Sequence, residues 1–247
     1  YANWFGKMLH GDFGTSYMQK KSVIALMSKA LTVTLQLAIC AYIFAVVLGL
    51  VMGIIAAVNH GRWLDRTLMS LAVFGISAPV FWVAIVLQIV FALNLKWFPL
   101  SGVKTAAAYV LPILALGTRY AASIARVTRT SMLDVLSQDY IRTAEAKGLS
   151  RWTIIIKHAL RNALIPIITI AGTQLGDILT GSILIESIFA MPGMGKLLLD
   201  AINARDLPLI EGSVMYIAVI CVAIYLAVDI LYAVVDPRIR LGGEASE

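Results

Sequence analysis

Long runs without charged side chains constrain this chain more than any other feature of its sequence. Residues 31–58 and 67–95 contain no Asp, Glu, Lys or Arg. At about 1.5 Å per residue, a helix of either length can cross the roughly 30 Å hydrocarbon layer of a membrane. Three further apolar segments carry one charged residue each: 105–125 with Arg119, 162–185 with Asp177, and 212–235 with Asp229. We therefore predict an all-α, polytopic membrane helical bundle with five spans in this chain.

The distribution of Lys and Arg between these spans predicts the topology. Residues 59–66, 119–161 and 236–247 hold two, eight and two basic residues, whereas 96–104 and 186–211 hold two each. Cytoplasmic loops of membrane proteins collect Lys and Arg, so the first set is expected to be cytoplasmic.

This topology divides the chain into three parts. We expect an extracytoplasmic N-terminal segment at 1–30, a transmembrane domain at 31–235 and a cytoplasmic tail at 236–247. The domain would include a cytoplasmic loop at 126–161 and an extracytoplasmic loop at 186–211. The four lysines in 1–30 fit the charge rule poorly unless a further span precedes Tyr1.

The long basic loop has the periodicity of helices. One apolar face is formed by Trp152, Ile155, Ile156, Ala159, Leu160, Ala163 and Leu164, spaced to run directly into the next span. Ser150 is the expected N-cap of this helix, and Gly148 separates it from a preceding helix in which Asp139 and Arg142 are spaced for a surface ion pair. Periodicity alone leaves two interpretations open: a docking element for another protein, or a helix on anionic lipid.

A resemblance favours docking. The sequences DYIRTAEAKG at 139–148 and HALRNA at 158–163 closely resemble the cytoplasmic signature loop of permease subunits in ATP-binding-cassette importers, in its peptide and nickel permease form. The generic motif has Glu-Ala-Ala where Arg142, Thr143 and Ala144 stand, so only the last Ala matches it. Further blocks that resemble this branch are HGDFGTS at 10–16, WFPLSG at 97–102, ESIFAMPGMGKLLLDAI at 186–202, RDLP at 205–208 and DPRIR at 236–240.

The resemblance implies an importer-type permease fold of six spans, with one helix preceding Tyr1. It also implies a docking loop for an ATPase subunit, formed by Arg142, Thr143, Ala144, Glu145, Ala146, Lys147, Gly148, Leu149, Ser150 and Arg151. The implied partners are a second homologous permease, two ATPase subunits that bind ATP and Mg, and an extracytoplasmic substrate-binding protein. The implied location is the inner or cytoplasmic membrane of a prokaryote, with the C-terminus cytoplasmic.

Two further sites are hypotheses. Thr173, Gln174, Asp177, Thr180 and Gly181 give the fifth span a polar, small-residue face that we expect to line the translocation path. There Asp177 would meet a cationic group of the substrate, although an interhelical hydrogen bond explains it equally well. The resemblance also suggests contact with the binding protein at Pro192, Gly193, Gly195 and Lys196.

No catalytic or metal site is expected in this chain. His10, His60 and His158 lie in separate loops, and Cys40 and Cys221 lie inside predicted spans. The segment PGMGKLLL resembles a phosphate-binding loop, but Leu197 stands where Ser or Thr is needed. We therefore expect no cofactor here, ATP hydrolysis on partner subunits, and no nucleic-acid partner.

Within the branch we expect a dipeptide or oligopeptide as the cargo, with nickel, a metal chelate or glutathione as alternatives. From a different class, a secondary transporter or channel would require internal repeats, and none is convincing.

Overall fold

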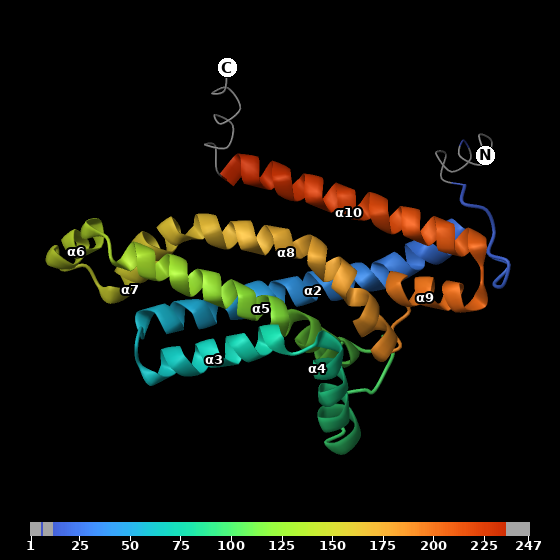
Figure 1. The fold of residues 1–247 in the computed structure, drawn as a ribbon, viewed down its shortest axis with the longest axis horizontal. Coiled ribbons are helices and arrows are strands. Elements are labelled where there is room, and N and C mark those ends of the chain that lie inside the picture. Colours follow the sequence, from blue (N-terminus) through green and yellow to red (C-terminus); the bar gives the residue numbers. More distant parts are fainter. Residues whose placement is uncertain (1–5, 7–11, 236–247) are drawn as a thin grey trace. The chain divides into compact units, whose positions relative to one another are not determined.

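The computed structural model describes residue 6 and residues 12–235, and most of these are helical (Figure 1). In chain order the elements are α2 (Val23–Val58), α3 (Trp63–Ser77), α4 (Val80–Leu87), η1 (Gln88–Asn94), α5 (Ala107–Leu136), α6 (Asp139–Ala146), α7 (Arg151–Thr153), η2 (Ile154–Leu160), α8 (Arg161–Ile188), α9 (Met194–Ala204) and α10 (Leu207–Val235). The elements labelled η are π-helices. Within the described residues, strand-type pairing is limited to one bridge between Thr15 and Ser22. The all-α prediction is confirmed.

The membrane-spanning potential agrees with the five predicted spans. By length and composition, four helices can cross a membrane: Val23–Val58, Ala107–Leu136, Arg151–Ile188 and Leu207–Val228. The pair Trp63–Ser77 and Val80–Asn94 makes a fifth if it is counted as one broken span. The amphipathic helix predicted after Gly148 does continue directly into the next span, because α7, η2 and α8 follow one another without a gap.

Two segments depart from the regular α-helix that a simple count of apolar residues assumes. The segment 67–95 is not one continuous helix, because Ala78 before Pro79 is extended (φ −71°, ψ 129°) and Pro79 has no N–H to donate. The apolar stripe after Ser150 is only partly buried: Ile155 and Ala159 are buried, whereas Trp152 is 74% exposed and Ile156 is 50% exposed. The π-helix Ile154–Leu160 has a wider turn than the α-helix assumed from the sequence.

The chain divides into two compact units. The first unit comprises Tyr1–Ala41, Val80–Leu116 and Gly176–Ile224, and the second comprises Tyr42–Pro79, Gly117–Leu175 and Tyr225–Glu247. Several long helices therefore contribute one part to each unit.

The second unit is built on close contact of α2 with α5. A Cβ atom added at Gly53 would lie 2.5 Å from Thr128 Cβ, and one at Gly49 would lie 2.7 Å from Ile124 Cβ. Glycines four residues apart thus let the backbones of the two helices approach closely, which is small-xxx-small packing. Helix α3 packs against α5 as well, through Gly75 (Figure 1). The buried core of this unit consists of Ala45, Ala57, Ala121, Ile124, Met132, Ile141, Ala144, Ile154, Ile155, Ala159, Ala163, Ile167 and Ala171.

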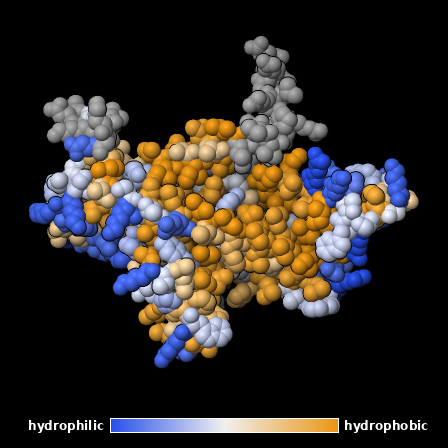
Figure 2. All heavy atoms as spheres, turned by 180° about the vertical axis from the view of Figure 1, so that it is seen from behind, coloured by the Kyte–Doolittle hydropathy of each residue, from blue (hydrophilic) through white to orange (hydrophobic). Residues whose placement is uncertain are grey.

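The first unit has a separate core beneath α9. Its buried members are Val23, Met27, Ala30, Met194, Ala201 and Leu209, from α2, α9 and α10. Outside both cores, large apolar side chains remain exposed along the long helices, as in the row Ile39, Ile43, Val47, Val51 and Ile55 on α2. Figure 2 shows one face on which hydrophobic residues cover a broad area and hydrophilic residues gather in separate patches. Apolar surface of this extent is typical of helices that contact lipid or other membrane chains.

Candidate functional site

The predicted docking loop forms a sharp corner between two helices of the second unit. Helix α6 ends at Ala146, and Gly148 then adopts φ +73°, a left-handed conformation that glycine reaches without steric cost. Ser150 follows as the N-cap of α7 and accepts a hydrogen bond from the Thr153 N–H at 3.3 Å, as predicted. The predicted ion pair between Asp139 and Arg142 is present at 3.7 Å, but both side chains are exposed, so its energy is small.

The corner is anchored on one side and open on the other. Ala144 is buried and belongs to the core of the second unit together with Ile141. The other nine predicted docking residues are exposed: Arg142, Thr143, Glu145, Ala146, Lys147, Gly148, Leu149, Ser150 and Arg151. Among the described residues, none beyond the immediate chain neighbours has a heavy atom within 4 Å of a Cβ built at Gly148. The corner therefore presents backbone and small side chains to any partner surface.

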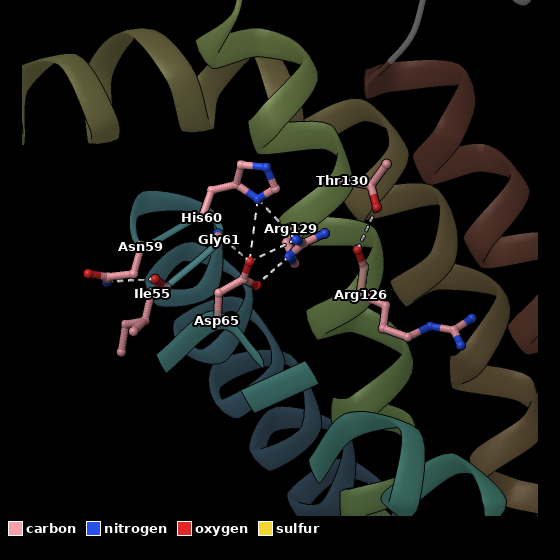
Figure 3. Close-up of polar contacts among 8 residues, drawn as sticks. All are labelled: Ile55, Asn59, His60, Gly61, Asp65, Arg126, Arg129 and Thr130. Atoms are coloured by element: carbon pink, nitrogen blue, oxygen red, sulfur yellow. Dashed lines mark hydrogen bonds and ion pairs between the residues drawn. The ribbon is translucent and has the colours of Figure 1, made fainter. Parts of the chain in front are cut away.

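A buried ion pair in the same unit joins two residues that are 64 positions apart in the sequence, and it was not predicted from the sequence. Arg129 on α5 donates to Asp65 on α3 twice, from Nε to Oδ1 at 2.6 Å and from Nη2 to Oδ2 at 2.8 Å (Figure 3). The Gly61 N–H also donates to Oδ2 at 3.0 Å, and His60 Nδ1 lies 3.3 Å from the same oxygen. The Asp65 side chain is 4% exposed. Asp65 therefore fixes the turn that joins α2 to α3 against α5.

In the first unit, a buried carboxylate holds the start of α9. Glu186 accepts hydrogen bonds from Thr34 Oγ1 at 2.7 Å, from Ser182 Oγ at 3.1 Å and from the Gly195 N–H at 2.8 Å. Thr34 Oγ1 in turn accepts from the Met194 N–H at 2.8 Å. The first amides of a helix need acceptors, and here α8 and α2 supply them from a distance.

The predicted binding-protein contact divides into buried and accessible residues. A Cβ at Gly193 would lie 2.4 Å from Glu186 Cδ, and one at Gly195 would lie 2.5 Å from Ile183 Cα. Both glycines are buried because the loop packs so closely, whereas Pro192 is exposed and Lys196 is half-buried. Lys196 forms an ion pair with Asp200 at 2.9 Å. Of the four residues, Pro192 and Lys196 are thus the ones that another protein can reach directly.

A second carboxylate, Asp206, organises the turn that precedes α2. Its side chain accepts from Ser16 Oγ, from the Tyr17 N–H at 3.1 Å and from the Met18 N–H at 3.2 Å. Burial by itself would raise the pKa of Asp206, but these bonds and one from the Leu209 N–H outweigh it and hold the pKa below its usual value. The sequence signal was Asp206 within RDLP, directly before α10.

The predicted path residues lie on α8, but they differ in how exposed they are to solvent or lipid. Thr173, Asp177 and Thr180 are exposed, Gly181 is half-buried, and Gln174 is buried. Within the described part of the chain, Gln174 Oε1 has no hydrogen-bond partner. The exposed polar face thus consists of three residues spaced by four and three, as expected along one side of a helix. The tail at 236–247, His10 and the side chain of Asp229 lie outside the described residues.

Comparisons with known proteins agree with this architecture. A family model described as "Binding-protein-dependent transport system inner membrane component" matches residues 49–241. Two curated relatives are the dipeptide transport system permease protein DppB of Bacillus subtilis (strain 168) and the glutathione transport system permease protein GsiC of Escherichia coli (strain K12). DppB is 47% identical over 242 residues, which cover 98% of this chain and 79% of DppB. GsiC is 43% identical over 238 residues, which cover 96% of this chain and 78% of GsiC.

A solved structure shares the fold. A chain of the MetNI methionine ABC transporter in an inward-facing conformation matches with a TM-score of 0.72 at 20% identity, over 86% of this chain and 97% of that one. The family match and the two relatives each cover well over half of the sequence. This chain therefore belongs to the family of binding-protein-dependent inner membrane transport components, and it is a permease subunit of an ABC importer.

Proposed function

We propose that this permease carries short peptides across a prokaryotic inner or cytoplasmic membrane, driven by ATP hydrolysis on partner subunits. The two relatives described above are named for transport of dipeptides and of glutathione, and glutathione is itself a tripeptide. A peptide backbone is the chemistry that these two substrates share. Nickel and metal chelates are the alternative cargo, and the experiment below separates them.

The observation that carries the coupling mechanism is the exposed corner formed by α6, Gly148 and α7. Only two residues separate the end of α5 at Leu136 from the start of α6 at Asp139, and α7 continues through η2 into α8. A displacement of the corner is therefore passed to two long helices through short, ordered connections. We infer that residues 142–151 dock on an ATPase subunit, which binds ATP and Mg, and that the closing of two such subunits moves the corner.

The other sites take roles in the same cycle. A second homologous permease would complete the path, and the exposed face of Thr173, Asp177 and Thr180 on α8 supplies polar groups for it. The extracytoplasmic binding protein would contact Pro192 and Lys196, while Glu186 holds the loop that carries them. With the binding protein outside and the ATPases in the cytoplasm, the tail at 236–247 would be cytoplasmic.

The test is reconstitution of the whole importer. This chain would be produced with the second permease, the two ATPases and the binding protein encoded with it, and then placed in proteoliposomes that contain ATP. We expect ATP-dependent uptake of a radiolabelled dipeptide, competed by unlabelled oligopeptide or glutathione and not by a nickel chelate. Uptake of the nickel chelate instead would overturn the substrate class, and uptake that persists without the ATPases would overturn the importer.

A further inference from the structure

We propose that Asp65 and Arg129 are positioning residues that join the turn between α2 and α3 to α5, so that this turn moves with the docking corner. The inference rests on the proposed function in one respect, namely that the corner is where an ATPase pushes. The turn between α2 and α3, which lies outside the docking loop, would then help to carry the movement of the corner to the membrane-spanning helices. The observations that carry it are the geometry of the pair and a second attachment of the same turn.

The pair is built to fix position. Its two bonds are parallel, Nε to Oδ1 and Nη2 to Oδ2, so they set the angle between the two groups as well as their separation (Figure 3). The Asp65 side chain is 4% exposed and that of Arg129 is 24% exposed. Removing two charges from water offsets much of their attraction, so a buried ion pair adds little net stability compared with apolar packing. Apolar side chains in the same place would not fix the angle between the two helices' side chains as these two parallel hydrogen bonds do.

The turn itself is drawn into the same cluster. Gly61 adopts φ +75° and donates its N–H to Asp65 Oδ2 at 3.0 Å. His60 Nδ1 lies 3.1 Å from Arg129 Nη2 and 3.3 Å from Asp65 Oδ2. The Asp65 carboxylate thus contacts the backbone of the turn at Gly61 and the side chain of Arg129 on α5.

A second attachment connects the end of α2, directly before the turn, to the docking corner. Arg151, the last residue of the predicted docking loop, donates from Nη2 to the Val58 carbonyl at 3.4 Å, at the end of α2. Residues 59–62 therefore lie between two attachments. One is the hydrogen bond that the Val58 carbonyl accepts from Arg151 at the start of α7. The other is the ion pair of Asp65 with Arg129 on α5. Arg129 lies seven residues before the end of α5, about 10 Å along the helix. Both attachments reach helices that flank the corner, and all of these residues belong to the second unit.

The direct test is a distance measurement in the reconstituted importer. Spin labels would be placed by Arg62→Cys in the turn and Thr130→Cys on α5, both exposed, with Cys40 and Cys221 replaced by Ser. With Asp65 intact, we expect the same distance distribution without nucleotide and with ATP bound. With Asp65→Asn, the distribution should broaden and shift when ATP binds. Two results would overturn the proposed link between the turn and α5. One is a label distance that changes on ATP binding although the pair is intact, and the other is an Asn variant that behaves like the protein with the intact pair.

The functional test compares transport with ATP hydrolysis. In the assembled importer, Asp65→Asn and Arg129→Gln should each lower the number of substrate molecules carried per ATP by about tenfold, with the KM for ATP unchanged. The double variant should be no worse than either single variant. Each single variant leaves one buried charge without its partner, whereas the double variant removes both charges. The matched control is Asp134→Asn, an exposed acid on α5 that forms no ion pair within the described part of the chain, and it should leave the ratio unchanged.

The outcomes separate this inference from the proposed function. If transport and ATP hydrolysis fall in proportion, the pair only stabilises the fold, and the proposed role in coupling is wrong. If Asp65→Asn does not assemble, Arg129→Lys, which keeps the charge but loses the parallel pair of bonds, gives the same comparison. The distance measurement requires no transported substrate, so a wrong substrate class would leave it valid.

Discussion

Thr34 Oγ1 lies 2.7 Å from Glu186 Oε1, and this hydrogen bond joins α2 to the end of α8 across 152 positions of sequence. The same hydroxyl oxygen accepts from the Met194 N–H, so the two side chains together cap the start of α9. The N-cap residue Gly193 has no side chain to do this, and a larger residue there would collide with the Glu186 carboxylate. The glycine and the buried acid therefore depend on one another.

Replacing Glu186 with Ala should destabilise the loop that leads into α9. The Gly195 N–H would lose its acceptor in a buried position, which costs roughly 1–3 kcal/mol for each such group. Glu186→Gln should cost less, because the amide oxygen can still accept from the backbone while its NH₂ group donates to the hydroxyl of Thr34. Thermal unfolding in detergent, with cleavage near residue 192 by a protease, would measure both changes. Glu211→Ala, an exposed acid on α10, is the control, and an effect equal to that of Glu186→Ala would contradict the role assigned to Glu186.

Gly53→Ala should be more harmful than Gly75→Ala, although both glycines face α5. The added Cβ would approach Thr128 Cβ to 2.5 Å and the Ala125 carbonyl oxygen to 2.7 Å, and the backbone carbonyl cannot rotate away. At Gly75 the nearest atom is 3.3 Å away, on a side chain. We expect about 1–3 kcal/mol of overpacking at Gly53 and less than half of that at Gly75. Equal unfolding temperatures for the two variants would show that α2 and α5 can separate freely.

The helices could be predicted because a membrane imposes an apolar side chain at nearly every exposed position. That requirement is local, so the charge-free run at 31–58 and the run at 212–235, whose one charged residue is Asp229, were found from sequence alone. The turn chemistry at Gly148 and Ser150 was predictable for the same reason, since both act on neighbouring backbone.

The three buried acids could not be identified because their partners are far away in sequence. Asp65 pairs with Arg129 across 64 positions, and Asp206 contacts Ser16 across 190. In the sequence each acid lies next to an apolar run and resembles an ordinary charge at the end of a span. Local periodicity also assumed 3.6 residues per turn, which the π-helix Ile154–Leu160 does not have.

Substitutions at Gly148 should distinguish backbone conformation from surface shape. Gly148→Ala places a Cβ on a left-handed residue, at a cost of about 1–2 kcal/mol, whereas Asn tolerates that conformation better. Because no heavy atom of the described residues beyond the chain neighbours lies within 4 Å of a Cβ at this position, the added Cβ clashes with none of them. If the ATPase needs only the bend, Gly148→Asn should retain more of the copurifying ATPase than Gly148→Ala. If it needs a flat surface, as we expect for a docked corner, both variants should lose it. Full retention by both would contradict docking at Gly148.

The turn at Ser16 should loosen when the pH is lowered. The folded-state pKa of Asp206 is below the unfolded value of about 3.9, so its contribution to stability is complete above that value and is lost as the pH falls through the folded pKa. Protection of the Tyr17 and Met18 amides from hydrogen exchange, corrected for intrinsic rates, should decline below about pH 4. Asp206→Asn should reduce their protection at neutral pH and remove this pH dependence. A pH profile that the substitution leaves unchanged would assign it to another group.

Asp177 should recognise the positive amino terminus of a peptide. Its side chain is exposed on α8, and a charge at mid-membrane costs about 2.5–3.5 kcal/mol unless it faces water or protein, so it is expected to line the path or meet a partner helix. If it lines the path, Asp177→Asn should reduce uptake of a free dipeptide by about tenfold, because a hydrogen bond to a charged group contributes roughly 1.5–3 kcal/mol. Uptake of the N-acetylated dipeptide, which has no positive amine, should not change, and Asp177→Glu should retain most of the activity. Equal losses for both peptides, with less of the second permease copurifying, would instead assign Asp177 to the contact between the two permeases.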